Sequence, residues 1–248
     1  MLYHPTLEKL EQLRLFGMAK ALKEQTDQPS YSALRFEDRL GLLVDQEATE
    51  RDNKQLQTRL KTAKLRLTAT VEDIDYAQVR GLDKSTMLAL ARCQWIRDHQ
   101  NCIITGATGA GKTYLACALG HTACREGYKV LYRRTPQLFE ELAAGHADGR
   151  YRRLIAAYTK AHLLLLDDWG LTSLTAQQAT DFLELIEARY DIRATLLVSQ
   201  IPVEKWHDLI AHPTLADAAL DRLVHSAHRL LLKGESFRKK APKPLLEP

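Results

Sequence analysis

The chain has 248 residues, 45% of them hydrophobic and 27% charged, which is enough to bury a core without disulfide or metal support. This composition excludes a disordered or collagen-like chain, and a net charge of +4 is too small to indicate nucleic-acid binding by itself. No apolar run reaches the roughly 18–20 residues of a membrane helix, and the N-terminus has no signal-peptide pattern. We therefore expect a cytoplasmic protein with no membrane partner.

The first 75 residues have the hydrophobic spacing of helices and contain no run of β-branched residues. A first helix is expected to continue until Pro29 interrupts it. A second helix is expected to begin near Ser32 and to continue to about Ala63. The sequence therefore predicts an all-helical N-terminal domain at 1–75, followed by a second domain at 76–248.

The second domain is predicted to be α/β. Residues 71–84 have the character of a linker, and a helix is expected at 84–98 with Ser85 as its N-cap. Beyond residue 100, short apolar runs alternate with helical stretches, which predicts a five-stranded parallel sheet covered by helices. The predicted strands lie at 102–105, 129–132, 162–167, 195–199 and 229–232. The predicted helices between and around them lie at 112–126, 137–144, 152–160, 176–191 and 216–227.

The four cysteines predict no metal or redox site, because no two of them have C-x-x-C spacing. Cys102, Cys117 and Cys124 stand in apolar segments. We expect them to be buried as small hydrophobic residues.

Residues 106–113, Gly-Ala-Thr-Gly-Ala-Gly-Lys-Thr, match the phosphate-loop pattern G-x-x-x-x-G-K-[ST] in full. The motif follows a predicted strand and opens a predicted helix, so its backbone N–H groups can surround phosphate oxygens. Lys112 is expected to bridge the β- and γ-phosphates, and Thr113 to ligate Mg²⁺. The alternative is a glycine-rich turn without a ligand. The predicted cofactors are ATP and Mg²⁺, and the residues expected to contact the nucleotide are Gly106, Ala107, Thr108, Gly109, Ala110, Gly111, Lys112, Thr113 and Tyr114.

Two aspartates follow the four leucines at 163–166, where a predicted strand ends. Asp167 would emerge at the carboxyl end of the strand beside the phosphate loop, where it can hold Mg²⁺ directly or through water. Asp168, as the next residue, is expected to point the other way and to face the attacking water. The alternative is that Asp168 only caps the turn that follows.

A polar pair, Ser199 and Gln200, ends the fourth predicted strand. One strand, near Val130, lies between the two motif strands in sequence, so the motif strands are not expected to be neighbours in the sheet. The fourth strand is expected to separate them, which would bring Ser199 or Gln200 near the γ-phosphate or the attacking water. The alternative is an ordinary polar pair at a strand end.

Two basic stretches are candidates for contact with DNA phosphates. Residues 54–67 contain lysines and arginines but no acid, and they form either a phosphate-contacting surface or a solvated helix face. Residues 145–153 fall between the second and third predicted strands, and they form either a basic loop that grips DNA phosphates or a solvated loop and helix start. No residues have the character of base readers, so little sequence specificity is expected. The candidate residues are Lys54, Arg59, Lys61, Lys64, Arg150, Arg152 and Arg153.

These motifs resemble those of the AAA+ ATPases, and more closely those of the IstB-like transposition helper proteins, which are relatives of DnaC-type helicase loaders. The resemblance covers nearly the whole chain. In the second domain it rests on the phosphate loop and on Leu-Leu-Leu-Leu-Asp-Asp-Trp-Gly at 163–170, Ser-Gln-Ile-Pro at 199–202, Leu-Asp-Arg-Leu-Val-His at 220–225 and Lys-Gly-Glu-Ser-Phe-Arg-Lys at 233–239. In the first domain it rests on Leu-Arg-Leu-Phe-Gly-Met-Ala at 13–19.

The resemblance implies an ATPase that oligomerises with ATP on double-stranded DNA and recruits or stimulates a transposase, with hydrolysis resetting the assembly. It implies that Arg222 is an arginine finger for a neighbouring subunit, and that Arg238 contacts the nucleotide of its own subunit. Many AAA+ proteins carry Glu at the position of Asp168, and Asn where this chain offers Ser199 or Gln200. Both departures favour slow hydrolysis.

Three other functions are compatible with a phosphate loop. A DnaC-type helicase loader is the main alternative, although the absence of Cys before residue 93 excludes the subtype with a zinc-binding N-terminal module. A small-molecule kinase would need an acceptor pocket and a lid with paired arginines, and the Arg222 and Arg238 patterns argue against it. A DNA-binding module that does not hydrolyse its nucleotide is the third, and a turnover that rises with DNA would exclude it.

Overall fold

The computed structural model describes residues 5–76 and 81–233. They divide into two compact units, Met1–Thr58 and Arg59–Pro248, and the division falls within helix α3 (Phe36–Ala63). Among the described residues, no helix is both long and apolar enough to cross a membrane.

The division comes earlier than the boundary at 75 and 76 that the sequence suggested. Residues 59–75 belong to the second unit because they pack against it. Nε of Arg59 donates a hydrogen bond to the carbonyl of Cys124 at 2.8 Å. Ala63 and Ala69 are buried.

The first unit is helical, as predicted, but its first helix is interrupted. α1 (Pro5–Gln12) and α2 (Phe16–Asp27) are separate because Arg14 adopts a left-handed φ of 60° between them. A short 3₁₀ helix, η1 (Pro29–Ala33), then leads to α3. The carboxylate of Glu47 on α3 accepts the backbone N–H of Gly17 at 2.8 Å, which satisfies a free donor at the start of α2.

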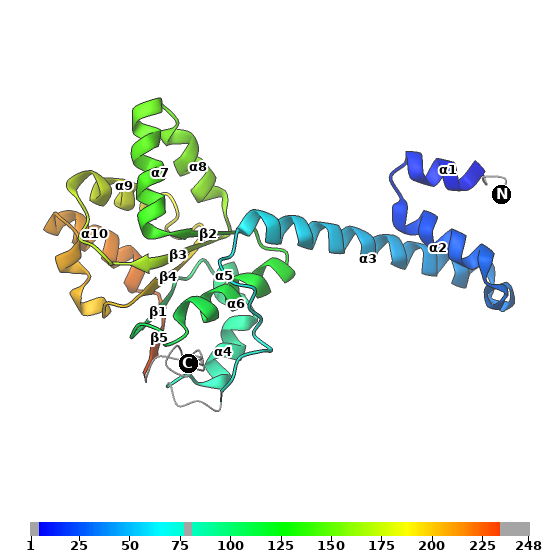
Figure 1. Ribbon diagram of the computed structural model, residues 1–248, viewed down its shortest axis with the longest axis horizontal. Helices are drawn as coiled ribbons and strands as arrows, with labels where there is room; N and C mark the ends of the chain where they lie inside the picture. Colours follow the sequence, from blue (N-terminus) through cyan, green and yellow to red (C-terminus); the bar gives the residue numbers. More distant parts are fainter. Residues whose placement is uncertain (1–4, 77–80, 234–248) are drawn as a thin grey trace, which may run out of the picture. The chain divides into compact units, whose positions relative to one another are not determined.

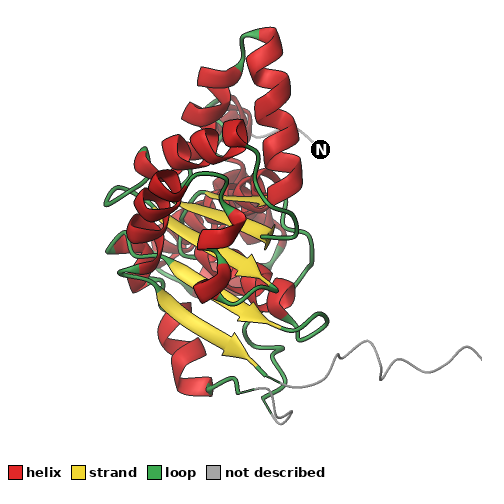
Figure 2. Ribbon diagram, turned by 90° about the vertical axis from the view of Figure 1, so that its left-hand side faces the viewer, coloured by secondary structure: helices red, strands yellow, loops and turns green. Residues whose placement is uncertain are grey.

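The second unit is a five-stranded parallel sheet in the order β2-β3-β4-β1-β5 (Figure 2). This confirms the predicted sheet, and β4 separates the two motif strands β1 and β3 as expected. The strands are β1 (Cys102–Gly106), β2 (Val130–Arg134), β3 (Leu163–Trp169), β4 (Ala194–Ser199) and β5 (His228–Leu232). The helices are α4 (Lys84–Ala91), α5 (Gln94–Arg97), α6 (Lys112–Arg125), α7 (Thr135–Asp148), α8 (Tyr151–Lys160), α9 (Ala176–Glu187) and α10 (Pro213–Val224), with 3₁₀ helices η2 (Val203–Lys205) and η3 (His207–Leu209).

The helix predicted at 84–98 differs in two respects from the observed α4 and α5. Cys93 has a left-handed φ of 56° and breaks the segment in two. The N-cap is Asp83 and not Ser85, because the Asp83 carboxylate accepts the backbone N–H of Thr86 at 2.8 Å.

Helices cover both faces of the sheet, with α7 to α10 on one side and α4 and α6 on the other (Figure 1). Leu164 and Leu166 join the core cluster under α7 to α10, whereas Leu165 faces Gly120 of α6. The four leucines of β3 are all fully buried, because successive side chains of one strand enter opposite cores. Each contributes roughly 1.5–3 kcal/mol by leaving water.

All four cysteines are buried free thiols, as expected for three of them. Burial raises the pKa of Cys102 to about 12 and that of Cys124 to about 11. These thiols stay protonated at neutral pH and act as small hydrophobic residues.

Candidate nucleotide-binding site

The phosphate loop connects the end of β1 to the start of α6, which is the predicted strand–loop–helix arrangement. Gly106 has a φ of 150°, and a Cβ atom there would lie 2.4 Å from the carbonyl oxygen of Leu232 in β5. Gly111, the N-cap of α6, has a left-handed φ of 91°. Both positions therefore need glycine. The loop leads directly into α6, so its backbone N–H groups lie at a helix N-terminus, where an anion is favoured.

Lys112 is held against the loop that precedes it. Its side chain is buried, and Nζ donates hydrogen bonds to the carbonyls of Gly106 at 2.8 Å and Ala107 at 2.9 Å. An ammonium group with three donors at this place can also donate to a phosphate in the loop. The residue that the motif singles out is thus positioned by backbone contacts.

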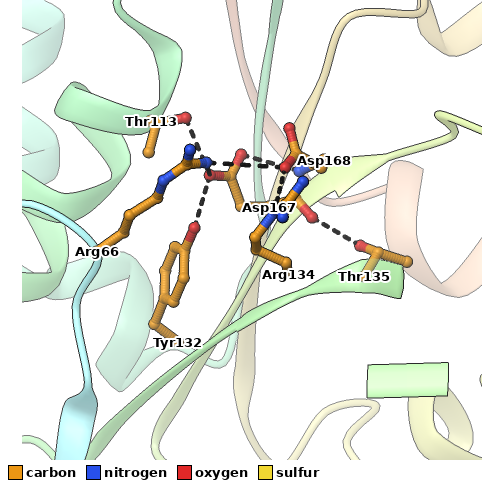
Figure 3. Close-up of polar contacts among 7 residues, drawn as sticks. All are labelled: Arg66, Thr113, Tyr132, Arg134, Thr135, Asp167 and Asp168. Atoms are coloured by element: carbon orange, nitrogen blue, oxygen red, sulfur yellow. Dashed lines mark hydrogen bonds and ion pairs between the residues drawn. The ribbon is translucent and has the colours of Figure 1, made fainter. Parts of the chain in front are cut away.

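The two predicted metal ligands touch each other. Thr113 Oγ1 donates a hydrogen bond to Asp167 Oδ2 at 2.9 Å, and the hydroxyl of Tyr132 donates to the same oxygen at 2.8 Å (Figure 3). Burial, followed by the charge of Asp167, raises the pKa of Tyr132, so this phenol remains a neutral donor. A hydroxyl and a carboxylate oxygen in contact beside a phosphate loop fit Mg²⁺, which takes oxygen ligands and keeps several waters.

Asp168 points differently from the expectation for a regular strand. Its φ of 59° is left-handed, and the pairing of β3 with β4 shifts register between Leu166 and Trp169. As a result, both carboxylates approach one nitrogen, Nη1 of Arg66, which lies 3.9 Å from Asp167 Oδ2 and 3.8 Å from Asp168 Oδ2. The bulge therefore turns Asp168 toward the same side as Asp167.

Two arginines at this site were not predicted as site residues, Arg66 and Arg134. Nε of Arg134 donates to Asp168 Oδ2 at 2.7 Å, and this bond, together with the charge of Asp168, raises the pKa of Arg134. Arg134 ends β2 and pairs in register with Asp167 of β3, whereas the strand predicted at 129–132 stopped two residues before it. Arg66 comes from the basic stretch at 54–67, and nothing in its spacing indicates this contact.

Ser199 and Gln200 have different environments. Ser199 is fully buried, and its Oγ donates to the carbonyl of Trp169 at 2.7 Å and accepts the N–H of Ile201 at 3.0 Å. Gln200 Oε1 instead accepts the hydroxyl of Thr108 in the phosphate loop at 2.6 Å. Of these two candidates for a place near the γ-phosphate or the attacking water, Gln200 is the one in contact with the phosphate loop.

A cleft of about 440 Å³ joins these groups. It is lined by the phosphate loop, by the ends of β3 and β4, and by the two arginines. Its lining residues include Arg66, Thr108, Gly109, Gly111, Lys112, Thr113, Tyr114, Arg134, Asp167, Asp168, Ser199 and Gln200.

Arg222 lies at the other end of β1. Asn101, directly before β1, donates to the carbonyl of Arg222 at 3.1 Å, whereas the phosphate loop follows β1. The Arg222 guanidinium forms an ion pair with Glu187 at 2.9 Å. Since a five-residue strand spans roughly 16 Å, Arg222 does not reach the phosphate loop of its own chain. Arg238 lies outside the described residues.

The stretch 145–153 contains a short connection followed by a helix start, which agrees with the second interpretation of its sequence. It consists of the end of α7 and the start of α8, joined at Gly149 and Arg150. Arg150 forms an ion pair with Asp148, and its Nε lies 2.6 Å from the Asp148 carboxylate. Arg152 and Arg153 are exposed on the first turn of α8.

The candidates in 54–67 fall into both units. Lys54 is exposed in the first unit, and Lys61 and Lys64 are exposed in the second. Arg59 is half-buried, and its Nε donates a hydrogen bond to the carbonyl of Cys124. Of these four cations, Arg59 therefore has an evident structural role.

Comparison with known proteins places this site in a family. Residues 8–244 match the family described as IstB-like ATP binding protein. The chain belongs to this family. An insertion-sequence ATP-binding protein of Sinorhizobium fredii is 49% identical to this IstB-like chain over 239 residues, which are 96% of this chain and 98% of the relative.

Solved structures of low sequence identity share the fold of this IstB-like chain, which is that of the AAA+ proteins. The DnaC helicase loader matches with a TM-score of 0.56 at 19% identity, over 66% of this chain and 97% of that one. The replication initiator DnaA, bound to AMPPCP and single-stranded DNA, matches with a TM-score of 0.55 at 19% identity, over 69% of this chain and 52% of that one. The match thus spans about half of the DnaA chain.

Proposed function

We propose that this protein is an ATP-dependent DNA-binding transposition helper. It oligomerises on target DNA with ATP and recruits or stimulates a transposase, and slow ATP hydrolysis resets the assembly. The observation that carries the proposal is the contact of Thr113 with Asp167 at 2.9 Å beside a complete phosphate loop, in a chain of the IstB-like family. The insertion-sequence relatives support the setting in transposition.

The cleft residues have different roles in the transfer of the γ-phosphoryl group to water. Bound Mg²⁺ supplies positive charge that stabilises the transferring phosphoryl group. The loop N–H groups and Lys112 hold the phosphates, while Thr113 and Asp167 supply the oxygen ligands. Asp168 and Gln200 orient the attacking water. The site lacks an arginine finger from its own Arg222, so a neighbouring copy provides it.

Arg222 supports assembly through its position at the opposite end of β1. A contact between the phosphate-loop end of one copy and the Arg222 end of the next is head-to-tail, and repeats of it build a ring or a helical filament. ATP joins the copies in this arrangement because the γ-phosphate gives Arg222 an anionic partner. Loss of that phosphate weakens the junction.

DNA contact is assigned to exposed cations of the second unit and to Lys54. Arg152 and Arg153, together with Lys61 and Lys64, are exposed and would neutralise backbone phosphates. Affinity is therefore expected to fall steeply with salt and to change little with sequence. The DnaA neighbour, solved with single-stranded DNA, supports a DNA role for this fold.

A DnaC-type helicase loader is the second candidate, since the fold also resembles the DnaC loader. Sedimentation with double-stranded DNA separates the two. We expect the chain to form a large DNA complex with ATP, and to remain small with ADP or without nucleotide, at moderate salt. The matched control is Lys112→Ala, which should not assemble. A chain that stays monomeric and free of DNA with every nucleotide contradicts the proposal and favours a partner-dependent loader.

A further inference from the structure

The guanidinium of Arg66 lies beside the two residues, Thr113 and Asp167, that are proposed to hold Mg²⁺. Its Nη1 is 3.9 Å from Asp167 Oδ2, the same oxygen that accepts the hydrogen bond of Thr113. It is also 3.8 Å from Asp168 Oδ2 (Figure 3). One guanidinium therefore faces both carboxylates of the site at ion-pair distance.

Arg66 is held less tightly than the second arginine of the cleft. Arg134 makes a direct 2.7 Å bond to Asp168, whereas neither Arg66 distance is within hydrogen-bonding range. The Arg66 side chain is 44% exposed and projects from the segment that follows α3. Buried Ala63 and Ala69 anchor this segment on both sides. Between these two buried residues, the long and half-exposed side chain of Arg66 has solvent on one side and room to change direction.

A magnesium ion held by Thr113 and Asp167 would compete with Arg66 for the same carboxylate oxygen. The two like charges would then lie within a few ångströms of each other in a partly enclosed cleft, where their repulsion is strong. The γ-phosphate of an ATP bound in this cleft would supply several anionic oxygens and give the displaced guanidinium a new bidentate partner. A diphosphate leaves that place without an anion.

We infer that Arg66 is a specificity-determining residue that distinguishes ATP from ADP. Without nucleotide it neutralises Asp167 and Asp168, and with ATP it turns to the γ-phosphate. The inference rests on the proposed use of this cleft for ATP, but it does not depend on DNA, on a transposase or on assembly. It adds a nucleotide contact from the segment after α3 to those of the phosphate loop.

The first test compares the affinities of wild type, Arg66→Ala and Arg66→Lys for Mg-ATP and Mg-ADP by calorimetry. Arg66→Ala should weaken ATP binding about tenfold, the size expected for one charge-assisted contact, and should leave ADP binding within about twofold. Arg66→Lys should lose part of the ATP preference, because an ammonium keeps the charge but not the planar fork. The matched control is Lys205→Ala, an exposed cation of the second unit that does not line the cleft.

The second test needs no nucleotide. Mn²⁺ binding to the nucleotide-free protein, followed by electron paramagnetic resonance, should tighten several-fold in Arg66→Ala, because the carboxylates lose their resident cation. Circular dichroism should show an unchanged fold. Equal changes in ATP and ADP affinity, or unchanged Mn²⁺ binding, would overturn the inference. Absence of ATP binding in the wild type would instead overturn the proposed function, so the two failures are distinguishable.

Discussion

The two ends of the parallel sheet use arginine in opposite ways. At the carboxyl end, Arg66 and Arg134 face the carboxylates of Asp167 and Asp168 across an open cleft. At the amino end, Arg189 is buried and donates to the carbonyls of Tyr158 at 2.6 Å and Ala161 at 3.0 Å. Arginine therefore pairs with carboxylates of the cleft at one end of the sheet, and it donates hydrogen bonds to buried backbone carbonyls at the other.

The direction of the chain explains this difference. In a parallel β–α unit the helix begins at the carboxyl end of its strand, so N–H groups and positive partial charge gather there and favour an anion. The helices return to the amino end, where their last carbonyls need donors. Arg189 and Asn101 meet that need. An arginine near a helix terminus can therefore be interpreted only once its end of the sheet is known.

The largest expected effect tests the structural role of Arg189. Arg189→Met keeps most of the side-chain volume but leaves several buried carbonyls without donors, each worth about 1–3 kcal/mol. We expect the free energy of unfolding to fall by about 3–5 kcal/mol in urea titrations. ATP affinity of the folded protein should stay unchanged. A stable variant would show that solvent satisfies these carbonyls.

Lys112→Ala tests the carboxyl end and is expected to be slightly milder. It removes a buried ammonium that is held by two loop carbonyls and available to the phosphates. We expect ATP affinity to fall roughly a hundredfold, or about 2.8 kcal/mol. Calorimetry measures this loss, and thermal unfolding of the nucleotide-free protein should change far less. Retained ATP binding would mean that the loop alone holds the nucleotide.

A paired substitution distinguishes the two residues that end β4. Gln200→Ala should lower ATP hydrolysis about tenfold with little effect on stability, because Gln200 contacts the phosphate loop through Thr108. Ser199→Ala should cost about 1–2 kcal/mol of stability and leave hydrolysis nearly intact, because its hydroxyl is bound to backbone groups. Steady-state turnover and urea unfolding of both variants give the answer. The reverse pattern would make Ser199 the residue that acts on the γ-phosphate or the attacking water.

The smallest expected effect concerns Tyr132. Tyr132→Phe removes one of the hydrogen bonds to Asp167 Oδ2 and keeps the ring. We expect a loss of about 1 kcal/mol of stability, with Thr113 still donating to the same oxygen. Tyr128→Phe, in the loop before β2, is the control. A loss above that of the Ser199 variant would indicate that Tyr132 supports more than one carboxylate contact.

The sequence predicts the parts of this site that depend on local pattern. The phosphate loop, the strand that carries Asp167 and the separation of β1 from β3 by β4 all follow from short motifs and strand order. The direction of Asp168 does not, because a bulge reverses the alternation of a strand. Arg66 is also not predictable, since its contact with Asp167 spans about a hundred residues and depends on the path of the chain after α3.

In the proposed assembly, the two ends of the sheet meet between copies, and Arg222 of one copy completes the ATP site of the next. A mixing experiment tests it directly. Asp168→Asn keeps Arg222 but not the hydrolytic carboxylate, whereas Arg222→Ala keeps an intact cleft but lacks the finger. Each variant alone should be nearly inactive with ATP and duplex DNA, and their mixture should recover hydrolysis at mixed junctions. A mixture as inactive as its parts, or full activity of Arg222→Ala alone, would show that Arg222 does not complete the ATP site of a neighbouring copy.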